Sequence, residues 1–346
     1  MISVLIIFLS TISLILLNFF CKKKLFLLDH KTLAHKSFVS NNVVPLTGGT
    51  LLILNLILFS SNKFFLIFCI LIFILGILSD LHIIINPLKK FIIQFTLVFI
   101  YIYIFDLNII ITKIFFIDYL LKIKIFSIIF TVFCLLILMN GTNFIDGVNT
   151  LASGYYIIIF SIILYLSSKS QLNLNFNDFY YLLLSLVVIY FFNVLSKNYL
   201  GDSGSFLLSF VTGCYLITFC NNNLYLLKSV SPIFILLLLW YPAFENFFSI
   251  LRRLINKAHP SNPDNYHLHQ LLFIFIKLNF KNKIKINNIN SLTGNLINFY
   301  NLLIFVLASQ IYYHTKYLSY LVIFNILVYL SCYYLFKKNI NKNYSN

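Results

Sequence analysis

Charged side chains are scarce in this chain. They make up 10% of its 346 residues, only nine residues are acidic, and 60% of all residues are hydrophobic. A soluble domain averages about 25% charged residues, so this chain could not cover its surface with polar groups. The composition excludes a soluble globular fold and predicts an all-α, polytopic membrane protein whose apolar surface contacts lipid.

Cysteine motifs are also missing. The chain has six cysteines but no CxxC pair, and most of them lie in or beside apolar runs. This pattern indicates packing residues rather than a zinc site or a disulfide framework. The net charge is +16, yet no soluble segment carries an Arg-rich stripe with interleaved aromatics. We expect no nucleic-acid partner, because basic residues of membrane proteins gather in cytoplasmic loops.

Apolar runs that could cross a bilayer are plentiful. Eleven runs predict membrane spans, at residues 2–20, 46–61, 64–79, 89–105, 122–139, 151–167, 179–195, 203–220, 228–245, 294–314 and 317–336. We expect run 2–20 to be a retained helix and not a signal peptide, because its lysines follow the apolar run. The short run 109–121 carries Lys113 and Asp118 and is expected to lie at the membrane interface.

Basic residues set the expected orientation. An N-terminus outside places loops 21–45, 80–90, 140–150, 196–203 and 246–293 in the cytoplasm, together with the C-terminal tail 337–346. These segments hold 18 of the 25 Lys and Arg residues, as the positive-inside rule requires. No repeat and no second soluble domain interrupt the pattern, so residues 1–346 are expected to form one integral membrane domain.

Every cytoplasmic loop in this arrangement contains an acidic residue. The acids expected inside are Asp29, Asp80, Asp146, Asp202, Glu245 and Asp264, and those outside are Asp106, Asp118 and Asp178. A carboxylate deep in hydrocarbon costs about 2.5–3.5 kcal/mol, whereas one at the edge can face a water-filled cleft between helices. We therefore expect Asp80, Asp146 and Asp202 to meet at one site.

Each of these carboxylates also has a purely structural interpretation. Asp80 could simply end a helix, and Asp146 could begin one. Asp202, in NYLGDSGSF, could be an N-cap, although the same glycine-rich helix start would offer free backbone N–H groups to a phosphate. Asn140 and Asn143 could hydrogen-bond a polar ligand beside Asp146, or could reflect an Asn-rich background.

The longest loop carries two histidines and two arginines. His267 and His269 follow HPSNPD, which includes Asp264. Neutral imidazoles could bind a metal ion, and charged ones could bind phosphate. Arg252 and Arg253 could bind phosphate as bidentate donors or could anchor a span at the membrane surface.

Acids and phosphate-binding cations on one face indicate a particular chemistry. Clustered carboxylates repel one another unless a cation neutralises them. Hard oxygen ligands favour Mg²⁺, or Mn²⁺ as an alternative, over zinc. The pattern therefore predicts Mg²⁺-assisted phosphoryl transfer involving a lipid phosphate.

Five motifs in order resemble a known family. They are PLTGG (45–49), GILSD…NPLKKFIIQ (76–94), NGTNFIDGVNTLASG (140–154), YLGDSGSF (199–206) and RR…HPSNPDNYHLHQLL (252–272). Together they resemble the polyprenyl-phosphate N-acetylhexosamine-1-phosphate transferases of glycosyltransferase family 4. This family includes the enzymes that initiate O-antigen, enterobacterial common antigen and teichoic-acid lipids, and is related to phospho-N-acetylmuramoyl-pentapeptide transferase. The resemblance covers about residues 20–275.

The resemblance implies a reaction and a location. A polyprenyl phosphate, expected to be undecaprenyl phosphate, would attack a UDP-N-acetylhexosamine, expected to be UDP-GlcNAc, and release UMP. The lipid-linked product would begin cell-wall, lipopolysaccharide or other cell-surface polysaccharide synthesis at the bacterial inner membrane. Mg²⁺ would be the cofactor, and a homodimer is compatible with the resemblance.

Site roles follow by position in the motifs. The residues expected to be catalytic are Asp80, Asp146, Asp202, His267 and His269, with Asp202 and Asp146 as metal ligands. The residues expected to bind substrate are Asn140, Asn143, Lys89, Lys90, Arg252, Arg253 and Gly204.

Two positions depart from the family pattern. Ser79 replaces the first acid of an Asp-Asp pair, and Asn149 and Thr150 stand where Asp-Gly is common. A serine hydroxyl cannot replace a carboxylate as a base or metal ligand, but a lipid phosphate is already anionic near pH 7 and does not need that base. The alternative function is a non-catalytic polyprenyl-phosphate carrier or flippase, which would move lipid without releasing UMP.

Overall fold

The computed structural model describes residues 2–28, 44–170, 172, 177–224, 226, 228–257, 266–280 and 285–345. These residues form fourteen helices: α1 (Ile2–Lys24), α2 (Gly48–Phe59), α3 (Lys63–Asp80), α4 (Pro87–Phe105), α5 (Phe115–Leu121), α6 (Lys124–Ile145), α7 (Leu151–Ser170), α8 (Asn177–Val194), α9 (Gly201–Asn222), α10 (Pro232–Leu238), α11 (Trp240–Ile255), α12 (Leu268–Phe280), α13 (Ile286–Gln310) and α14 (Thr315–Ser345). Aspartate 264 lies outside the described residues.

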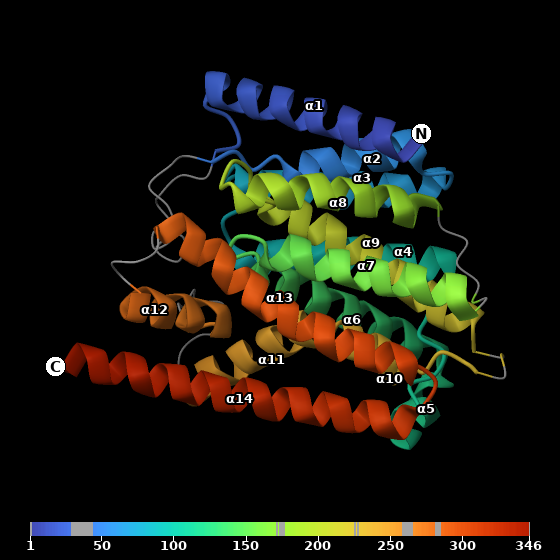
Figure 1. Ribbon diagram of the computed structural model, residues 1–346. Coiled ribbons are helices and arrows are strands. Elements are labelled where there is room, and N and C mark those ends of the chain that lie inside the picture. The colour runs from blue at the N-terminus through green and yellow to red at the C-terminus, as the bar shows by residue number, and fades with distance from the viewer. Residues whose placement is uncertain are drawn as a thin grey trace.

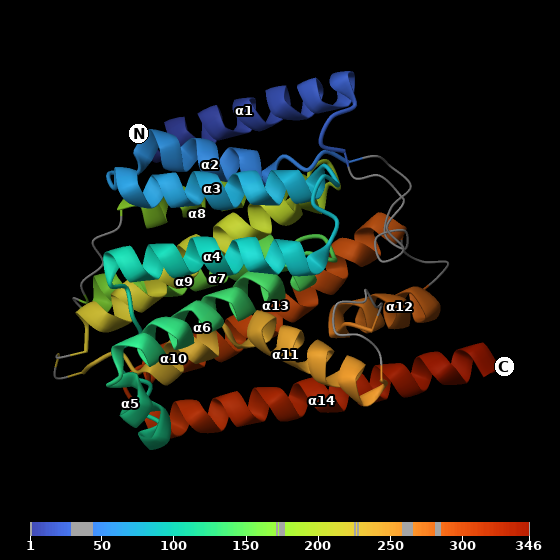
Figure 2. The same cartoon turned by 180° about the vertical axis from the view of Figure 1, so that it is seen from behind.

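The helices form one bundle with α9 in its middle. Helices α1 and α14 lie on opposite flanks, and the two chain termini lie at opposite ends of the bundle (Figures 1 and 2). Of the most apolar stretch of α9, 94% is buried, against 22% for α1 and for α14. Small residues let neighbouring helices approach α9 closely: a Cβ on Gly213 would lie 2.4 Å from the Leu135 side chain of α6.

The helical membrane architecture is confirmed, but a count of eleven spans is not. Each predicted run coincides with a helix or with the α10–α11 pair. By length and composition, eight helices of the described chain could each cross a membrane, or nine if α10 and α11 form one span. Helices α2 and α8 are shorter apolar helices, and the orientation remains a prediction.

The predicted run 228–245 is not one straight span. The chain bends by 72° between α10 and α11. Pro242 has no N–H to continue the helical hydrogen bonding, and the carbonyl oxygen of Leu238 accepts instead from the Tyr155 hydroxyl at 2.8 Å. The bend redirects α11, so its second half runs toward α14 (Figure 2).

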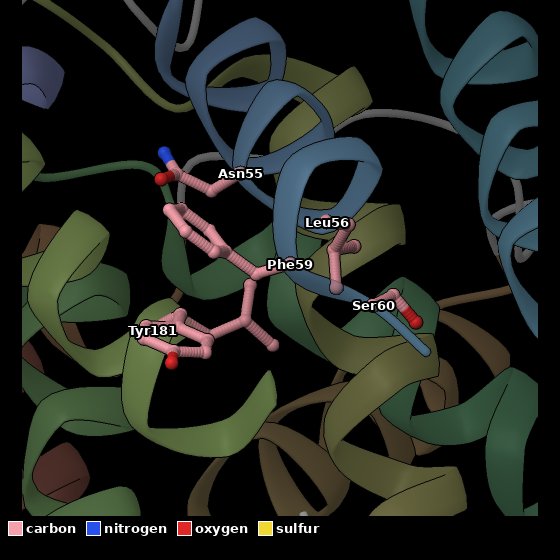
Figure 3. A pocket seen from close by; sticks show the side chains of 6 residues that line it. Asn55, Leu56, Phe59, Ser60 and Tyr181 are labelled. Atoms are coloured by element: carbon pink, nitrogen blue, oxygen red, sulfur yellow. The ribbon is translucent and has the colours of Figure 1, made fainter. Parts of the chain in front are cut away.

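A small depression lies between α2 and α8. It is shallow and holds no enclosed space for a water molecule, and the rings of Phe59 and Tyr181, which line it, stack with their centroids 4.3 Å apart (Figure 3). Its lining residues are Asn55, Leu56, Phe59, Ser60, Tyr181 and Leu182. The depression is at the C-terminal end of α2, away from the helix start that contacts α9, and the predicted site residues do not line it.

Candidate active site

Two carboxylates from other parts of the chain bind the start of α9. The backbone N–H groups of Asp202 and Ser203 donate to the two oxygens of Asp80, at 2.8 and 3.0 Å. The N–H of Gly201 donates to Asp146 Oδ2 at 3.2 Å. Asp80 ends α3 and Asp146 follows α6, so α9 brings together three motifs that are far apart in sequence.

This arrangement corrects two expectations. Asp202 is not an N-cap, because the capping position is Leu200, whose side chain makes no cap hydrogen bond. The expectation that the start of α9 offers free N–H groups to a phosphate is also wrong, since those of Gly201, Asp202 and Ser203 are occupied. These three N–H groups are therefore not available to a ligand.

Gly201 is required by both conformation and space. Its φ is +75°, a region that side-chain-bearing residues rarely adopt. A Cβ at this position would lie 2.9 Å from Asp80 Oδ2. The Gly-Asp sequence thus lets the Asp80 carboxylate approach the helix start.

The side chain of Asp202 turns toward α4. Its Oδ2 atom accepts a hydrogen bond from the Ser79 hydroxyl and lies 3.2 Å from Lys90 Nζ. The start of α4 positions this lysine, because Asn86 caps the helix by accepting from the N–H of Leu88 at 2.9 Å. Lys90 therefore reaches the carboxylates, whereas Lys89 is exposed. Ser79 acts here as a donor to a carboxylate.

Glycines pack the motif loops around α9. A Cβ on Gly76 would lie 2.2 Å from Ser203 Cα, and one on Gly49 would lie 2.5 Å from Gly204 N. Only glycine fits such approaches between backbones. Gly204, expected to bind substrate, is buried in this packing, so the structure gives it a packing role.

The asparagines before Asp146 lie along the last turns of α6. Asn140 donates to Gln94 Oε1 of α4 at 3.2 Å and to the Leu136 carbonyl at 2.9 Å. Asn143 is half-buried one turn later. Asn140 therefore ties α6 to α4 beside the carboxylates.

The departures at 149 and 150 lie in a buried amide network. Asn149, 3% exposed, donates through its side chain to Ser196 Oγ at 2.8 Å, and its backbone N–H donates to Asn290 at 3.0 Å. Thr150 has φ +68°, a strained value for a β-branched residue. Its carbonyl accepts from Asn298 at 2.8 Å. These contacts hold the loop and engage the Asn149 side chain with Ser196.

The two histidines stack against the loop that contains Asp146. The rings of His267 and His269 are 5.4 Å apart and nearly parallel, at 8°. His269 is fully buried, and within the described chain neither of its ring nitrogens has a hydrogen-bond partner. A Cβ on Gly147 would lie 2.8 Å from His269 Nε2. Burial is the main cause that lowers the pKa of His269 to about 3, so this ring is neutral at physiological pH.

The two arginines end α11 and rest on aromatic rings. The Arg252 guanidinium lies over Phe248 and Tyr333, at 5.6 and 5.8 Å from their centroids. Arg253 lies over Phe144, at 5.6 Å. Arg253 is thus beside the loop of Asp146, whereas Arg252 packs toward α14.

Glu245 is a site residue to which the sequence analysis gave no role. It is fully buried, its Oε1 atom lies 2.9 Å from His267 Nδ1, and its Oε2 atom accepts from the Tyr329 hydroxyl at 2.9 Å. One signal could have revealed it: Glu245 precedes Arg252 by seven residues, which is two helical turns on the same face.

A divalent ion can be tested against these donors. The described residues contain no group of three or more His, Cys, Asp or Glu side chains arranged to hold a metal. Asp202 and Asp146 supply hard oxygen donors near the start of α9. Because Mg²⁺ is commonly held by one or two carboxylates together with substrate phosphates, this donor set fits an ion shared with a diphosphate and does not fit a closed protein cage.

Comparisons with known proteins extend these observations. Residues 63–220 match the model of the family described as Glycosyl transferase family 4. The chain is 33% identical over 152 residues to the "Probable undecaprenyl-phosphate N-acetylglucosaminyl 1-phosphate transferase" of Bacillus subtilis, covering 42% of this chain and 40% of that protein. It is 27% identical over 232 residues to the "Undecaprenyl-phosphate alpha-N-acetylglucosaminyl 1-phosphate transferase" of Thermotoga maritima, covering 66% of this chain and 67% of that protein.

A third relative gives the same picture. The Yersinia pestis protein that has the same name as that of Thermotoga maritima is 25% identical over 156 residues, covering 42% of this chain and 41% of the relative. The chain thus spans between 40% and 67% of the length of these three proteins. The matches confirm the resemblance seen in the motifs.

Proposed function

We propose that this protein, whose residues 63–220 match the model of the family described as Glycosyl transferase family 4, transfers N-acetylglucosamine 1-phosphate from UDP-GlcNAc to undecaprenyl phosphate. The names of its relatives support both the donated sugar phosphate and the lipid acceptor. The reaction would begin a lipid-linked cell-surface polysaccharide, such as an O-antigen, at the bacterial inner membrane. The site would face the cytoplasm, where UDP-sugars are made.

The observation that carries this proposal is the meeting of three carboxylates and a lysine at one helix start. Asp80 and Asp146 bind the first N–H groups of α9, and Asp202 pairs with Lys90. Phosphoryl transfer depends mainly on alignment and on neutralising charge. A half-buried cluster of carboxylates with a lysine at its edge suits a diphosphate that is accompanied by a divalent cation better than a neutral ligand.

The reaction conserves atoms and electrons without an added oxidant or base. An anionic oxygen of the lipid phosphate forms a bond to the sugar-linked phosphorus. The bond between that phosphorus and the bridging oxygen breaks, and UMP leaves with the electron pair. No proton has to be removed from the nucleophile, so the replacement of an acid by Ser79 is compatible with turnover.

The side chains divide the remaining work. Asp80 positions α9, because both of its oxygens accept backbone N–H groups. Lys90 and Arg253 neutralise the diphosphate, and the neutral ring of His269 can offer it one N–H. Asp202 and Asp146 would hold Mg²⁺, or Mn²⁺. When bound, such an ion would neutralise charge on the diphosphate and on the leaving group.

Release of UMP tests the proposal. The purified chain is mixed with undecaprenyl phosphate, Mg²⁺ and a panel of UDP-sugars, and both UMP and the lipid product are followed. We expect UMP release that requires UDP-GlcNAc and the lipid together. Absence of UMP with every sugar would overturn the proposal and would favour the carrier alternative. The names of the relatives do not support that alternative.

A further inference from the structure

We propose that Glu245 is a positioning residue that fixes the orientation of His267 for binding the diphosphate of a nucleotide sugar. This inference rests on the proposed function, since it concerns the donor substrate of that reaction. It assigns a task to a side chain outside residues 63–220, the segment that matches the family model.

The contact between the two side chains defines the ring orientation. His267 Nδ1 lies 2.9 Å from Glu245 Oε1 and 3.2 Å from Ser249 Oγ. An ionised carboxylate only accepts hydrogen bonds, so Nδ1 carries a proton. The other ring nitrogen, Nε2, is on the far side of the ring and is turned away from Glu245.

Two ring contacts, one tilted and one stacked, fix the plane of the same ring. His267 is 5.1 Å from the ring of Phe144 and 5.4 Å from that of His269. These ring contacts alone would still allow the imidazole to flip about its Cβ–Cγ bond, which exchanges the positions of Nδ1 and Cδ2. The hydrogen bond to Glu245 removes that freedom, so the ring has one orientation only. Carboxylates that hold histidines in this way are common behind functional imidazoles.

The surroundings identify the ligand class. Phe144 lies in the last turn of α6, two residues before Asp146, and the guanidinium of Arg253 lies over its ring, 5.6 Å from the centroid. Both histidines are almost completely buried, and one of them, His269, has two ring nitrogens without partners in the described chain. Imidazoles beside a guanidinium and carboxylate oxygens suit a phosphorylated ligand with a shared divalent ion.

A simple structural role is the competing explanation. A buried carboxylate that accepts from His267 and Tyr329 also stabilises the contacts between α11, α12 and α14. If Glu245 only stabilised the fold, its loss would affect the kinetic constants for both substrates alike. If Glu245 orients His267, its loss would weaken only the binding of the UDP-sugar.

Three variants separate these roles. Glu245→Gln keeps the shape, and its amide oxygen can still accept from His267 while its nitrogen donates to the Tyr329 oxygen. Glu245→Met removes both acceptors at similar volume. We expect Glu245→Met to raise KM for UDP-GlcNAc by roughly 10–100-fold. Its KM for undecaprenyl phosphate should stay within about twofold of the original. In Glu245→Gln the KM for UDP-GlcNAc should return most of the way to the original value. If Glu245→Met does not fold, Glu245→Asp, which is one methylene shorter, should show the same selective effect with smaller size.

Tyr155→Phe is the matched control. It removes a buried hydroxyl that bonds the Leu238 carbonyl at the α10–α11 bend, outside the site. We expect this variant to unfold at a lower temperature and to keep both KM values. Equal rises in KM for both substrates in the Glu245 variants, or a similar rise in Tyr155→Phe, would overturn the positioning role.

Calorimetric titration with UDP in the presence of Mg²⁺ tests the positioning role separately from the proposed function. If the unaltered protein binds UDP and Glu245→Met binds it roughly 10–100-fold more weakly while no UDP-sugar is turned over, the proposed function fails and the positioning role stands. If UMP is released normally and UDP affinity does not change among the Glu245 variants, the positioning role fails alone.

Discussion

Replacing Asp80 with asparagine tests whether this carboxylate holds α9 in place. Both of its oxygens accept hydrogen bonds from the α9 backbone, at 2.8 Å from Asp202 N and 3.0 Å from Ser203 N. In Asp80→Asn one acceptor becomes an NH₂ group. That group would face a backbone N–H, so one hydrogen bond is lost and two donors oppose each other.

The loss can be given a magnitude. A hydrogen bond to a charged group is worth about 1.5–3 kcal/mol, and a carboxylate at a helix N-terminus adds about 0.3–1 kcal/mol. We therefore expect Asp80→Asn to reduce the free energy of unfolding by about 2–4 kcal/mol. For a chain of this size that reduction corresponds to a fall in Tm of roughly 3–6 °C.

Asp202→Asn is the control for this measurement. Its pair with Lys90 is partly exposed, with side-chain exposures of 19% for Asp202 and 23% for Lys90. Such a pair contributes about 0–1 kcal/mol, and asparagine keeps an amide oxygen that can still accept from the Ser79 hydroxyl. Both variants should lose UMP release, but only Asp80→Asn should lose thermal stability.

Thermal unfolding of the two variants in one detergent decides the matter. A Tm for Asp80→Asn equal to that of the unaltered protein would refute the argument that Asp80 caps α9 from another helix. Near-normal UMP release by Asp202→Asn would show that Asp202 is not needed to hold the metal ion or the diphosphate.

Three further predictions concern the edge of the site. Lys90→Met should lower kcat/KM on the order of tenfold, about 1.4 kcal/mol, because Lys90 reaches Asp202. Lys89 is exposed, so Lys89→Met should keep the original kcat/KM in the same UMP assay. Gly147→Ala should raise KM for UDP-GlcNAc on the order of tenfold, because its methyl group would displace His269; a KM unchanged in steady-state kinetics would contradict this. Treatment with EDTA should stop UMP release and Mg²⁺ or Mn²⁺ should restore it, whereas restoration by Zn²⁺ alone would contradict an oxygen-rich site.

Composition and position were enough to predict much of the architecture. Sixty per cent hydrophobic residues and 10% charged residues leave a helical membrane fold as the physical solution. The prediction that Asp80, Asp146 and Asp202 meet succeeded because a carboxylate at a span end has few favourable surroundings other than a polar cleft. Their chemical roles stay predictions.

Features that depend on distant partners could not be predicted. The bend before Pro242 needs Tyr155 to satisfy the Leu238 carbonyl, and nothing near Pro242 in sequence shows that partner. Asp80 and Asp202 are 122 residues apart, so local sequence cannot show that the Asp80 carboxylate accepts a hydrogen bond from the backbone N–H of Asp202. The wrong prediction of free N–H groups at the start of α9 has the same cause, because the carboxylates that occupy these groups are distant in sequence.

The close packing at the start of α9 limits how this protein can be recombined with its relatives. Gly49, Gly76 and Gly201 each leave no room for a methyl group beside a neighbouring segment. A chimera that imports one of these segments alone would combine surfaces shaped for different partners. Functional exchange should require that residues 45–49, 76–80 and 199–204 be transplanted as a set.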